Sequence, residues 1–338
     1  MKVSAKIVAF LVAVWGFSAC ALVFNEKPIL SSASSFNAEC VMEATSRRIL
    51  SEEHGDVRLP MASTTKIAAA ITVLESGIDT SKVIEIPQKA VGVEGSSVYL
   101  KEGDEYSVKD LLYGLMLRSG NDCAVALADC IDGGTEAFAC RMNKTAQRAG
   151  AINTHFRNPH GLPTKNHYTT AVDLSLITAY ALENPVFSEI VATKYYEPRG
   201  WTNKNKMLTR YNGAIGVKTG YTKQAGRCLV TAAERNGMKL ICTVLNCPTM
   251  YERTTALLDD AFLKYKNRLI LGEQQAVSFE GGEGIPMQNL YYPMMEGEEA
   301  HLEMKAQPAK NKENKKIVGQ FQIYLLKRLI FSGNLYKL

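Results

Sequence analysis

The sequence predicts an α+β fold that has a helix-rich first half, a strand-rich second half and a small β domain at the end. Residues 63–182 place apolar side chains at helical spacing, with breaks at glycine and proline. Residues 214–245 alternate apolar and polar side chains, as half-buried strands do. From about Gly272 onward, Gly, Pro, Glu and Lys are frequent and the expected strands are short. A chain of 338 residues is long enough for two domains.

Residues 1–34 have the pattern of an export leader. Two lysines precede an apolar stretch over residues 7–24, and small residues follow it. Cleavage after Ala33, lipoprotein processing at Cys20 and retention as a membrane anchor all stay open. We therefore expect an exported protein at the outer face of the cell membrane or in the cell wall. Any association with the membrane is expected to run through this segment.

The first half is expected to begin with two strands and to continue as a series of helices. Residues 38–60 read as two short strands joined by a polar turn. Residues 169–185 form an expected helix, with Thr169 or Thr170 near its cap and Pro185 as its stop. The other helices are expected over 63–74, over 108–131 with a break at 119–121, and over 135–149.

The second half is expected to start with strands over 214–247, including a hairpin turn at Asn236-Gly237. A helix over 251–266 follows, and residues 318–326 alternate like a strand. The charged stretch at 311–316 is expected to be a solvated turn. We place a domain boundary near 270, so that residues 35–270 form the main domain and residues 271–338 the small β domain.

Composition argues against several classes of protein. The formal net charge is +5, and no dense block of Lys and Arg is interleaved with aromatic residues, which disfavours nucleic-acid binding. The eight cysteines include no C-x-x-C pair, and no H-E-x-x-H motif occurs. We therefore expect no nucleic-acid partner, no metal and no cofactor.

Ser63 and Lys66 lie three residues apart at the start of an apolar helical run. A serine hydroxyl needs a base within hydrogen-bond reach to act as a nucleophile, and positions i and i+3 of a helix share a face. Lys66 can serve as that base if burial or neighbouring cations lower its pKa. On its own, the pair is more often an N-cap serine with a surface lysine.

Two further motifs favour the catalytic interpretation. Ser119-Gly120-Asn121 falls at the expected helix break, and Lys218-Thr219-Gly220 falls on an expected strand. Motifs of the forms S-x-x-K, S-x-N and K-T-G, in this order, mark penicillin-binding proteins and related β-lactamases.

From about residue 37 to residue 265, the chain resembles the low-molecular-mass penicillin-binding proteins, which are serine-type D-Ala-D-Ala carboxypeptidases. Besides the three motifs, the stretches "GSSVYLKEGD", "NPHGL", "HYTTAVDL" and "GVKTGYT" carry the resemblance. It implies a β-lactamase/transpeptidase-like fold, in which an antiparallel sheet lies between helix clusters. It also implies that the enzyme removes the terminal D-alanine from peptidoglycan stem pentapeptides.

The resemblance assigns a catalytic role to each of five residues. Ser63 is expected to attack the carbonyl between the two D-alanines and form an acyl-enzyme, while Lys66 accepts its proton. Ser119 is expected to relay a proton to the leaving amine, with Lys218 close by to tune that relay. Asn121 is expected to hold the amide of the substrate.

Four more residues are expected to bind the substrate. Thr219 and Gly220 line the strand along which the peptide pairs. The backbone N–H of Tyr221 forms the oxyanion hole together with that of Ser63. Arg253 is expected to bind the terminal carboxylate, although a surface arginine at a helix start stays open as an alternative.

The expected partners are peptidoglycan stem peptides, with β-lactam antibiotics as covalent inhibitors. Three alternatives remain at this stage: a D,D-endopeptidase that cleaves cross-links, a β-lactamase, and a non-catalytic wall-binding module. The β-lactamase is disfavoured because the sequence lacks the E-x-x-L-N stretch that supplies a deacylating base in class A enzymes.

Overall fold

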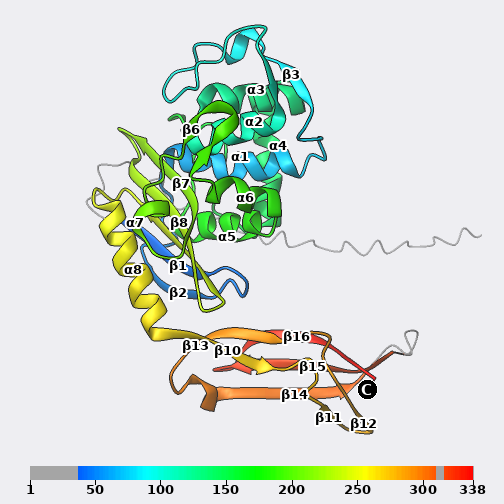
Figure 1. The fold of residues 1–338 in the computed structure, drawn as a ribbon. Coiled ribbons are helices and arrows are strands. Elements are labelled where there is room, and N and C mark those ends of the chain that lie inside the picture. The colour runs from blue at the N-terminus through cyan, green and yellow to red at the C-terminus, as the bar shows by residue number, and fades with distance from the viewer. Residues whose placement is uncertain (1–36, 310–315, 338) are drawn as a thin grey trace, which may run out of the picture.

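The protein is described by a computed structural model, which covers residues 37–309 and 316–337. Two domains are joined through the long helix α8 (Met250–Lys264), as Figure 1 shows. The leader expected over residues 1–34 and most of the charged turn expected at 311–316 lie outside the described residues. Within those residues, no helix combines the length and the apolar character needed to cross a bilayer.

The first domain is built on a five-stranded antiparallel sheet with the order β2-β1-β9-β8-β7. The tight turn between β8 and β9 is Asn236-Gly237, and both residues have positive φ, as expected for a two-residue hairpin. Strand β7 lies at an edge of the sheet, so one side of its backbone has no strand partner in the sheet. The strands are β1 (Ala38–Glu43), β2 (Ile49–Glu53), β7 (Ala214–Thr222), β8 (Gly226–Arg235) and β9 (Met238–Leu245).

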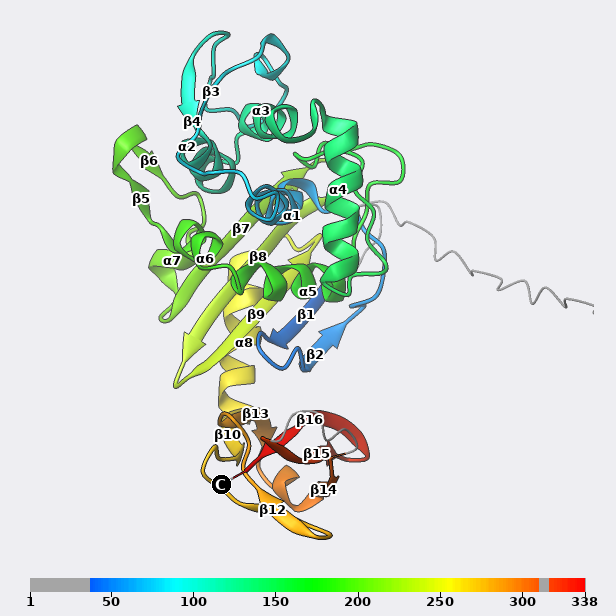
Figure 2. The same cartoon turned by 90° about the vertical axis from the view of Figure 1, so that its right-hand side faces the viewer.

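Helices cover both faces of this sheet, which confirms the predicted fold class (Figure 2). One face carries a cluster of helices, and a core of small and aliphatic side chains fills the space between cluster and sheet. The opposite face is covered by α8 and the short α7 (Met207–Arg210), over a second core. The clustered helices are α1 (Lys66–Leu74), α2 (Val108–Tyr113), α3 (Asn121–Asp132), α4 (Thr135–Arg148), α5 (Ala171–Leu182) and α6 (Pro185–Ala192).

Helix α5 differs from the prediction at its C-terminal end. Its start is as expected, because the Thr170 side chain caps it by accepting the backbone N–H of Asp173 at 3.0 Å. Pro185, however, does more than end a helix. It is the first residue of α6, where a proline costs no helical hydrogen bond, and the Asn184 side chain caps that helix.

The expected break between two helices is present at residues 119–121. Helix α2 continues into a π-helical turn, η3 (Gly114–Arg118), which ends at Ser119 with φ 64°. Helix α3 then begins at Asn121. The other short elements of this domain are η1 (Ala62–Thr65), η2 (Gln88–Ala90), η4 (Glu197–Arg199), β3 (Val83–Glu85), β4 (Glu105–Ser107), β5 (Tyr195–Tyr196) and β6 (Trp201–Thr202).

The second domain consists of antiparallel strands around a small apolar core; β11 and β12 are short, as expected, but β15 and β16 have nine residues each. Its first strand directly follows α8 and pairs with β13, so the strand pairing of this domain begins at Tyr265, a little before residue 270. Its elements are β10 (Tyr265–Leu271), β11 (Val277–Phe279), β12 (Gly282–Gly284), β13 (Leu290–Met295), η5 (Glu298–His301), β14 (Leu302–Pro308), β15 (Ile317–Leu325) and β16 (Arg328–Tyr336).

Arg48 connects the two domains. It lies in the β1–β2 turn, and its guanidinium donates to both carboxylate oxygens of Glu298 at 2.6 and 3.0 Å and to the Pro293 carbonyl at 2.7 Å. The same guanidinium lies over the rings of Tyr265 and Tyr292, 5.2 and 5.3 Å from their centroids. Both partners of the ion pair are largely buried, so this contact fixes the second domain against the first.

Candidate active site

Ser63 and Lys66 meet on one turn where η1 passes into α1. The Lys66 side chain is fully buried, and its Nζ lies 3.0 Å from Ser63 Oγ. Nζ also contacts Asn121 Oδ1 at 2.6 Å and the His160 carbonyl at 2.7 Å. Burial lowers the pKa of Lys66 well below its usual range, and the positive charge of Lys218 lowers it further. A buried amine with a depressed pKa is suited to accept a proton from the serine.

The helix break at residues 119–121 brings the Asn121 side chain to Lys66, two residues after Ser119. Ser119 is buried in the left-handed conformation that ends η3. Asn121, the first residue of α3, accepts from Lys66 and donates its Nδ2 to the Glu94 carbonyl at 2.6 Å. A left-handed backbone at a serine is uncommon, and such strained positions concentrate at functional sites.

Strand β7 brings Lys218 and Gly220 to the turn that carries Ser63 and Lys66. Lys218 is buried, and desolvation, with a contribution from the charge of Lys204, lowers its pKa to about 7. Gly220 packs so closely on the turn of Ser63 that a Cβ there would lie 3.1 Å from both the Ser63 nitrogen and the Met61 carbonyl oxygen. Thr219 lies between Lys218 and Gly220 on the strand, while the next residue, Tyr221, is 65% exposed.

Arg253 is not engaged with this cluster. It lies in the first turn of α8, and its guanidinium forms a paired hydrogen bond with the carboxylate of Glu39 on β1. A second, longer ion pair of 3.7 Å links it to Glu53 on β2. The guanidinium would have to leave Glu39 in order to bind a substrate carboxylate.

A profile described as D-alanyl-D-alanine carboxypeptidase (peptidase S11) matches residues 26–249. The chain belongs to the D-alanyl-D-alanine carboxypeptidase family. This membership identifies it as a serine peptidase of the low-molecular-mass penicillin-binding class, as the three motifs predicted.

Individual members of the family are similar over most of the chain. It is 32% identical over 253 residues to the carboxypeptidase DacF of Bacillus subtilis, covering 70% of this chain and 65% of that relative. The carboxypeptidase of Streptomyces sp. strain K15 is 39% identical over 214 residues, covering 56% of this chain and 73% of the relative. The solved structure of penicillin-binding protein 5 from Haemophilus influenzae superposes with a TM-score of 0.75 at 27% identity, covering 88% of this chain and 95% of the other.

The family stretch "NPHGL" contributes residues that the sequence analysis did not assign to the site. The His160 carbonyl accepts from Lys66, and the Asn158 side chain fixes this loop by accepting the backbone N–H of Gly161 at 2.7 Å. Gly161 has φ +90°, and a Cβ there would lie 1.9 Å from the Ala62 carbonyl oxygen and 3.0 Å from the Ser63 nitrogen. The stretch contributed to the family resemblance, but nothing in it signalled a contact of Gly161 with a serine 98 positions earlier in the sequence.

His167 contacts the turn that carries Ser63 through Thr65. Its Nδ1 accepts the backbone N–H of Arg157 at 3.0 Å, so Nε2 carries the proton and donates to Thr65 Oγ1 at 2.9 Å. Burial lowers the pKa of His167 to about 3, which keeps the ring neutral. This neutral ring fixes the residue that immediately precedes Lys66.

Lys204 and Asp122 also belong to the surroundings of the site. The Lys204 ammonium lies 3.4 Å from Ser96 Oγ and helps to lower the pKa of both Lys66 and Lys218. The buried Asp122 carboxylate accepts from the Ser97 hydroxyl and from the backbone N–H of Val98, which fixes the neighbouring loop over Asn121.

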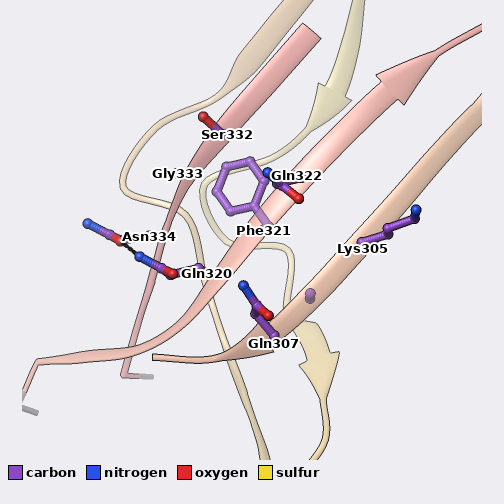
Figure 3. A pocket seen from close by; sticks show the side chains of 9 residues that line it. Lys305, Gln307, Gln320, Phe321, Gln322, Ser332, Gly333 and Asn334 are labelled. Atoms are coloured by element: carbon purple, nitrogen blue, oxygen red, sulfur yellow. Dashed lines mark hydrogen bonds between the residues drawn. The ribbon is translucent and has the colours of Figure 1, made fainter. Parts of the chain in front are cut away.

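A separate polar hollow of about 460 Å³ lies in the second domain, on strands β14, β15 and β16 (Figure 3). Amide side chains such as Gln307, Gln320 and Asn334 surround it. None of the residues that carry the three motifs lines it, so it takes no part in the site around Ser63.

In the described part of the chain, no group of three or more His, Cys, Asp or Glu side chains is arranged to hold a metal ion.

Proposed function

We propose that the chain acts as a serine-type D-Ala-D-Ala carboxypeptidase that cleaves peptidoglycan stem pentapeptides, with Ser63 as the nucleophile and Lys66 as its base. The observation that carries the proposal is the environment of Lys66 Nζ. A neutral amine has two N–H groups and one lone pair, and the Asn121 and His160 oxygens at 2.6 and 2.7 Å accept the two N–H groups. The lone pair is then directed to the hydroxyl group of Ser63, whose Oγ lies 3.0 Å from Nζ.

Ser63 Oγ attacks the carbonyl between the two D-alanines as its proton passes to Lys66. The negative charge that develops on the carbonyl oxygen is stabilised by the backbone N–H groups of Ser63 and Tyr221, at about 3 kcal/mol per donor. The close packing of Gly220 on Ser63 supports this pairing of donors, because it brings β7 against the nucleophile.

The leaving D-alanine needs a proton on its amine, and we assign the relay to Ser119, with Lys218 beside it. Lys218 has a pKa of about 7, so it exchanges protons readily at neutral pH. Asn121 Nδ2 has a second N–H besides the one given to Glu94, and this group can hold the amide of the substrate. Water then hydrolyses the acyl-enzyme.

The free carboxylate of the substrate is placed near Thr219, with a cation beyond it. Arg253 can supply that cation only by exchanging Glu39 for the substrate. Lys204 is the alternative, since it is exposed and its charge acts on Lys218. Either cation favours a substrate with a free C-terminus.

β-Lactams acylate the same serine in this proposal and leave it slowly, because the E-x-x-L-N stretch is absent. We also propose that residues 1–34 direct export, so that the enzyme meets its substrate outside the cytoplasm and can associate with the membrane through this segment.

The test compares the wild type with Ser63→Ala. We expect the wild type to release D-alanine from a pentapeptide and to form a long-lived penicilloyl adduct on the peptide containing Ser63, as seen by mass spectrometry. The variant should do neither while its circular dichroism is unchanged. Equal D-alanine release by both proteins would overturn the proposal, and rapid turnover of nitrocefin would replace it with a β-lactamase.

A further inference from the structure

A second polar hollow, of about 300 Å³, lies between the loop that follows Gly161 and the β7–β8 turn. Its lining includes one lysine, Lys165, and no Asp or Glu. We propose that this hollow is a subsite for an acidic group of the stem peptide, upstream of the bond that is cut. The inference rests on the proposed carboxypeptidase function. The lining residues are Pro163, Thr164, Lys165, Asn166, His167 and Gln224.

The loop that forms one wall of the hollow is fixed to the nucleophile. Gly161, near its start, packs against the backbone of Ser63. His167, at its end, is buried and bonds to Thr65 on the turn that carries Ser63. Both ends of this loop are therefore fixed relative to Ser63. A group bound in the hollow then lies at a defined distance from the carbonyl that Ser63 attacks.

If the substrate pairs along β7, the part of the peptide that acylates Ser63 extends toward this hollow. The leaving D-alanine lies at the end of the site that holds Ser119 and Lys218, and the carbonyl lies at Gly220, which packs on Ser63. The acyl part must extend the other way, past Tyr221 toward the β7–β8 turn. Gln224 is four residues beyond Gly220, about 13 Å of extended chain at most. Peptide residues two to three positions upstream of the cut therefore reach the hollow.

The chemistry of the lining suits a carboxylate. Lys165 supplies a charge, while the hydroxyl of Thr164 and the amides of Asn166 and Gln224 supply neutral donors. The buried His167 adds no opposing group, since its ring is neutral. In a stem peptide of the form L-Ala-γ-D-Glu-L-Lys-D-Ala-D-Ala, the free D-glutamyl carboxylate is two residues upstream of the D-alanine that acylates Ser63. We assign that carboxylate to the hollow.

Because Lys165 is exposed, the expected effect is moderate and sensitive to salt. The measurement is the ratio of kcat/KM for this pentapeptide to kcat/KM for the same peptide with its D-glutamyl carboxylate amidated. We expect a ratio of about ten for the wild type at low ionic strength, which is a difference of about 1.4 kcal/mol. Lys165→Glu should bring the ratio to one or below, and Lys165→Met to an intermediate value.

A matched control is Lys144→Glu, which makes the same charge change at an exposed lysine on α4 of the same domain. This variant should keep the wild-type ratio, as should any variant that merely lowers the fraction of folded enzyme. A wild-type ratio near one, or a ratio unchanged in Lys165→Glu, would overturn the subsite alone. If the wild type cleaved neither peptide and Ser63 formed no penicillin adduct, the proposed function would fail together with the subsite.

Discussion

Gly161 gives a direct test of how closely the 158–162 loop must fit the nucleophile. In Gly161→Ala the new Cβ would lie 1.9 Å from the Ala62 carbonyl oxygen, and protein Cβ atoms essentially never approach another atom below 3.0 Å. The backbone must therefore separate by at least 3.0 − 1.9 = 1.1 Å. That movement displaces either the Ser63 N–H that we assign to the oxyanion hole or the His160 carbonyl that accepts from Lys66. A misplacement of about 1 Å at reacting groups costs about 10²-fold in rate.

The substitution also places a side chain at φ +90°, a separate cost of about 1–2 kcal/mol in stability. Gly77→Ala is the matched control, because Gly77 has φ +78° and nothing within 4 Å of the new Cβ. Both variants should lose a similar part of their stability from strain, but only Gly161→Ala should lose about 10²-fold in activity.

The assay is the second-order rate of Ser63 acylation by a fluorescent penicillin, measured beside D-alanine release and the thermal unfolding midpoint. Acylation by Gly161→Ala within threefold of the wild type would refute the argument that this loop positions the nucleophile. An equal loss of activity in Gly77→Ala would refute it as well, since strain alone would then explain the effect.

Three further predictions follow from other contacts. Arg48→Met leaves the Glu298 carboxylate buried without its partner, so we expect about 3–5 kcal/mol of destabilisation and separate calorimetric transitions for the two domains; a single unshifted transition would contradict this. His167 has a folded pKa of about 3, below its unfolded value of about 6.5, so its contribution to stability should be retained above pH 6.5 and fall by about 2 kcal/mol between pH 7 and 5. Burial also lowers the pKa of His160, to about 4, so His167→Gln should remove about half of the slope in urea titrations at different pH values, and an unchanged slope would contradict this. Lys204→Met and Arg253→Met distinguish the two candidate cations for the substrate carboxylate. The variant that removes the cation in use should have a KM about tenfold higher for a D-Ala-D-Ala peptide but an unchanged KM for the C-terminal amide of that peptide. If neither variant shows this difference, both assignments fail.

The fold was predictable to the extent that each element follows a local rule. Alternation and the Asn236-Gly237 turn identified the β8–β9 hairpin, and the Thr170 cap identified the start of α5. Helix α6 was missed because Pro185 ends one helix and begins another, and its position alone does not distinguish the two roles. The contact of Arg48 with Glu298 joins residues 250 positions apart, and no local pattern encodes it.

The residues of the site were predictable where they belong to a sequence motif. They were not predictable where the contact is made by a backbone atom. Ser63, Lys66 and Asn121 carry the motifs, and the structure brings their side chains into contact. The His160 contribution is a carbonyl oxygen, which every residue type possesses, so its identity gives no signal. The engagement of Arg253 by Glu39 was likewise hidden, because it depends on the pairing of α8 with the first strand.

In the proposed mechanism, Ser63 and Lys66 therefore depend on remote segments of the chain for their roles as nucleophile and base. Burial alone disfavours a charged Lys66, but a buried neutral amine still needs partners for its N–H groups. Helix α3 supplies one acceptor through Asn121, and the loop at His160 supplies the other. With both N–H groups taken, one direction remains for the lone pair, and Ser63 occupies it. Removing either acceptor leaves an N–H free to turn toward Ser63, so the S-x-N motif and the 158–162 loop both determine whether the lysine acts as a base.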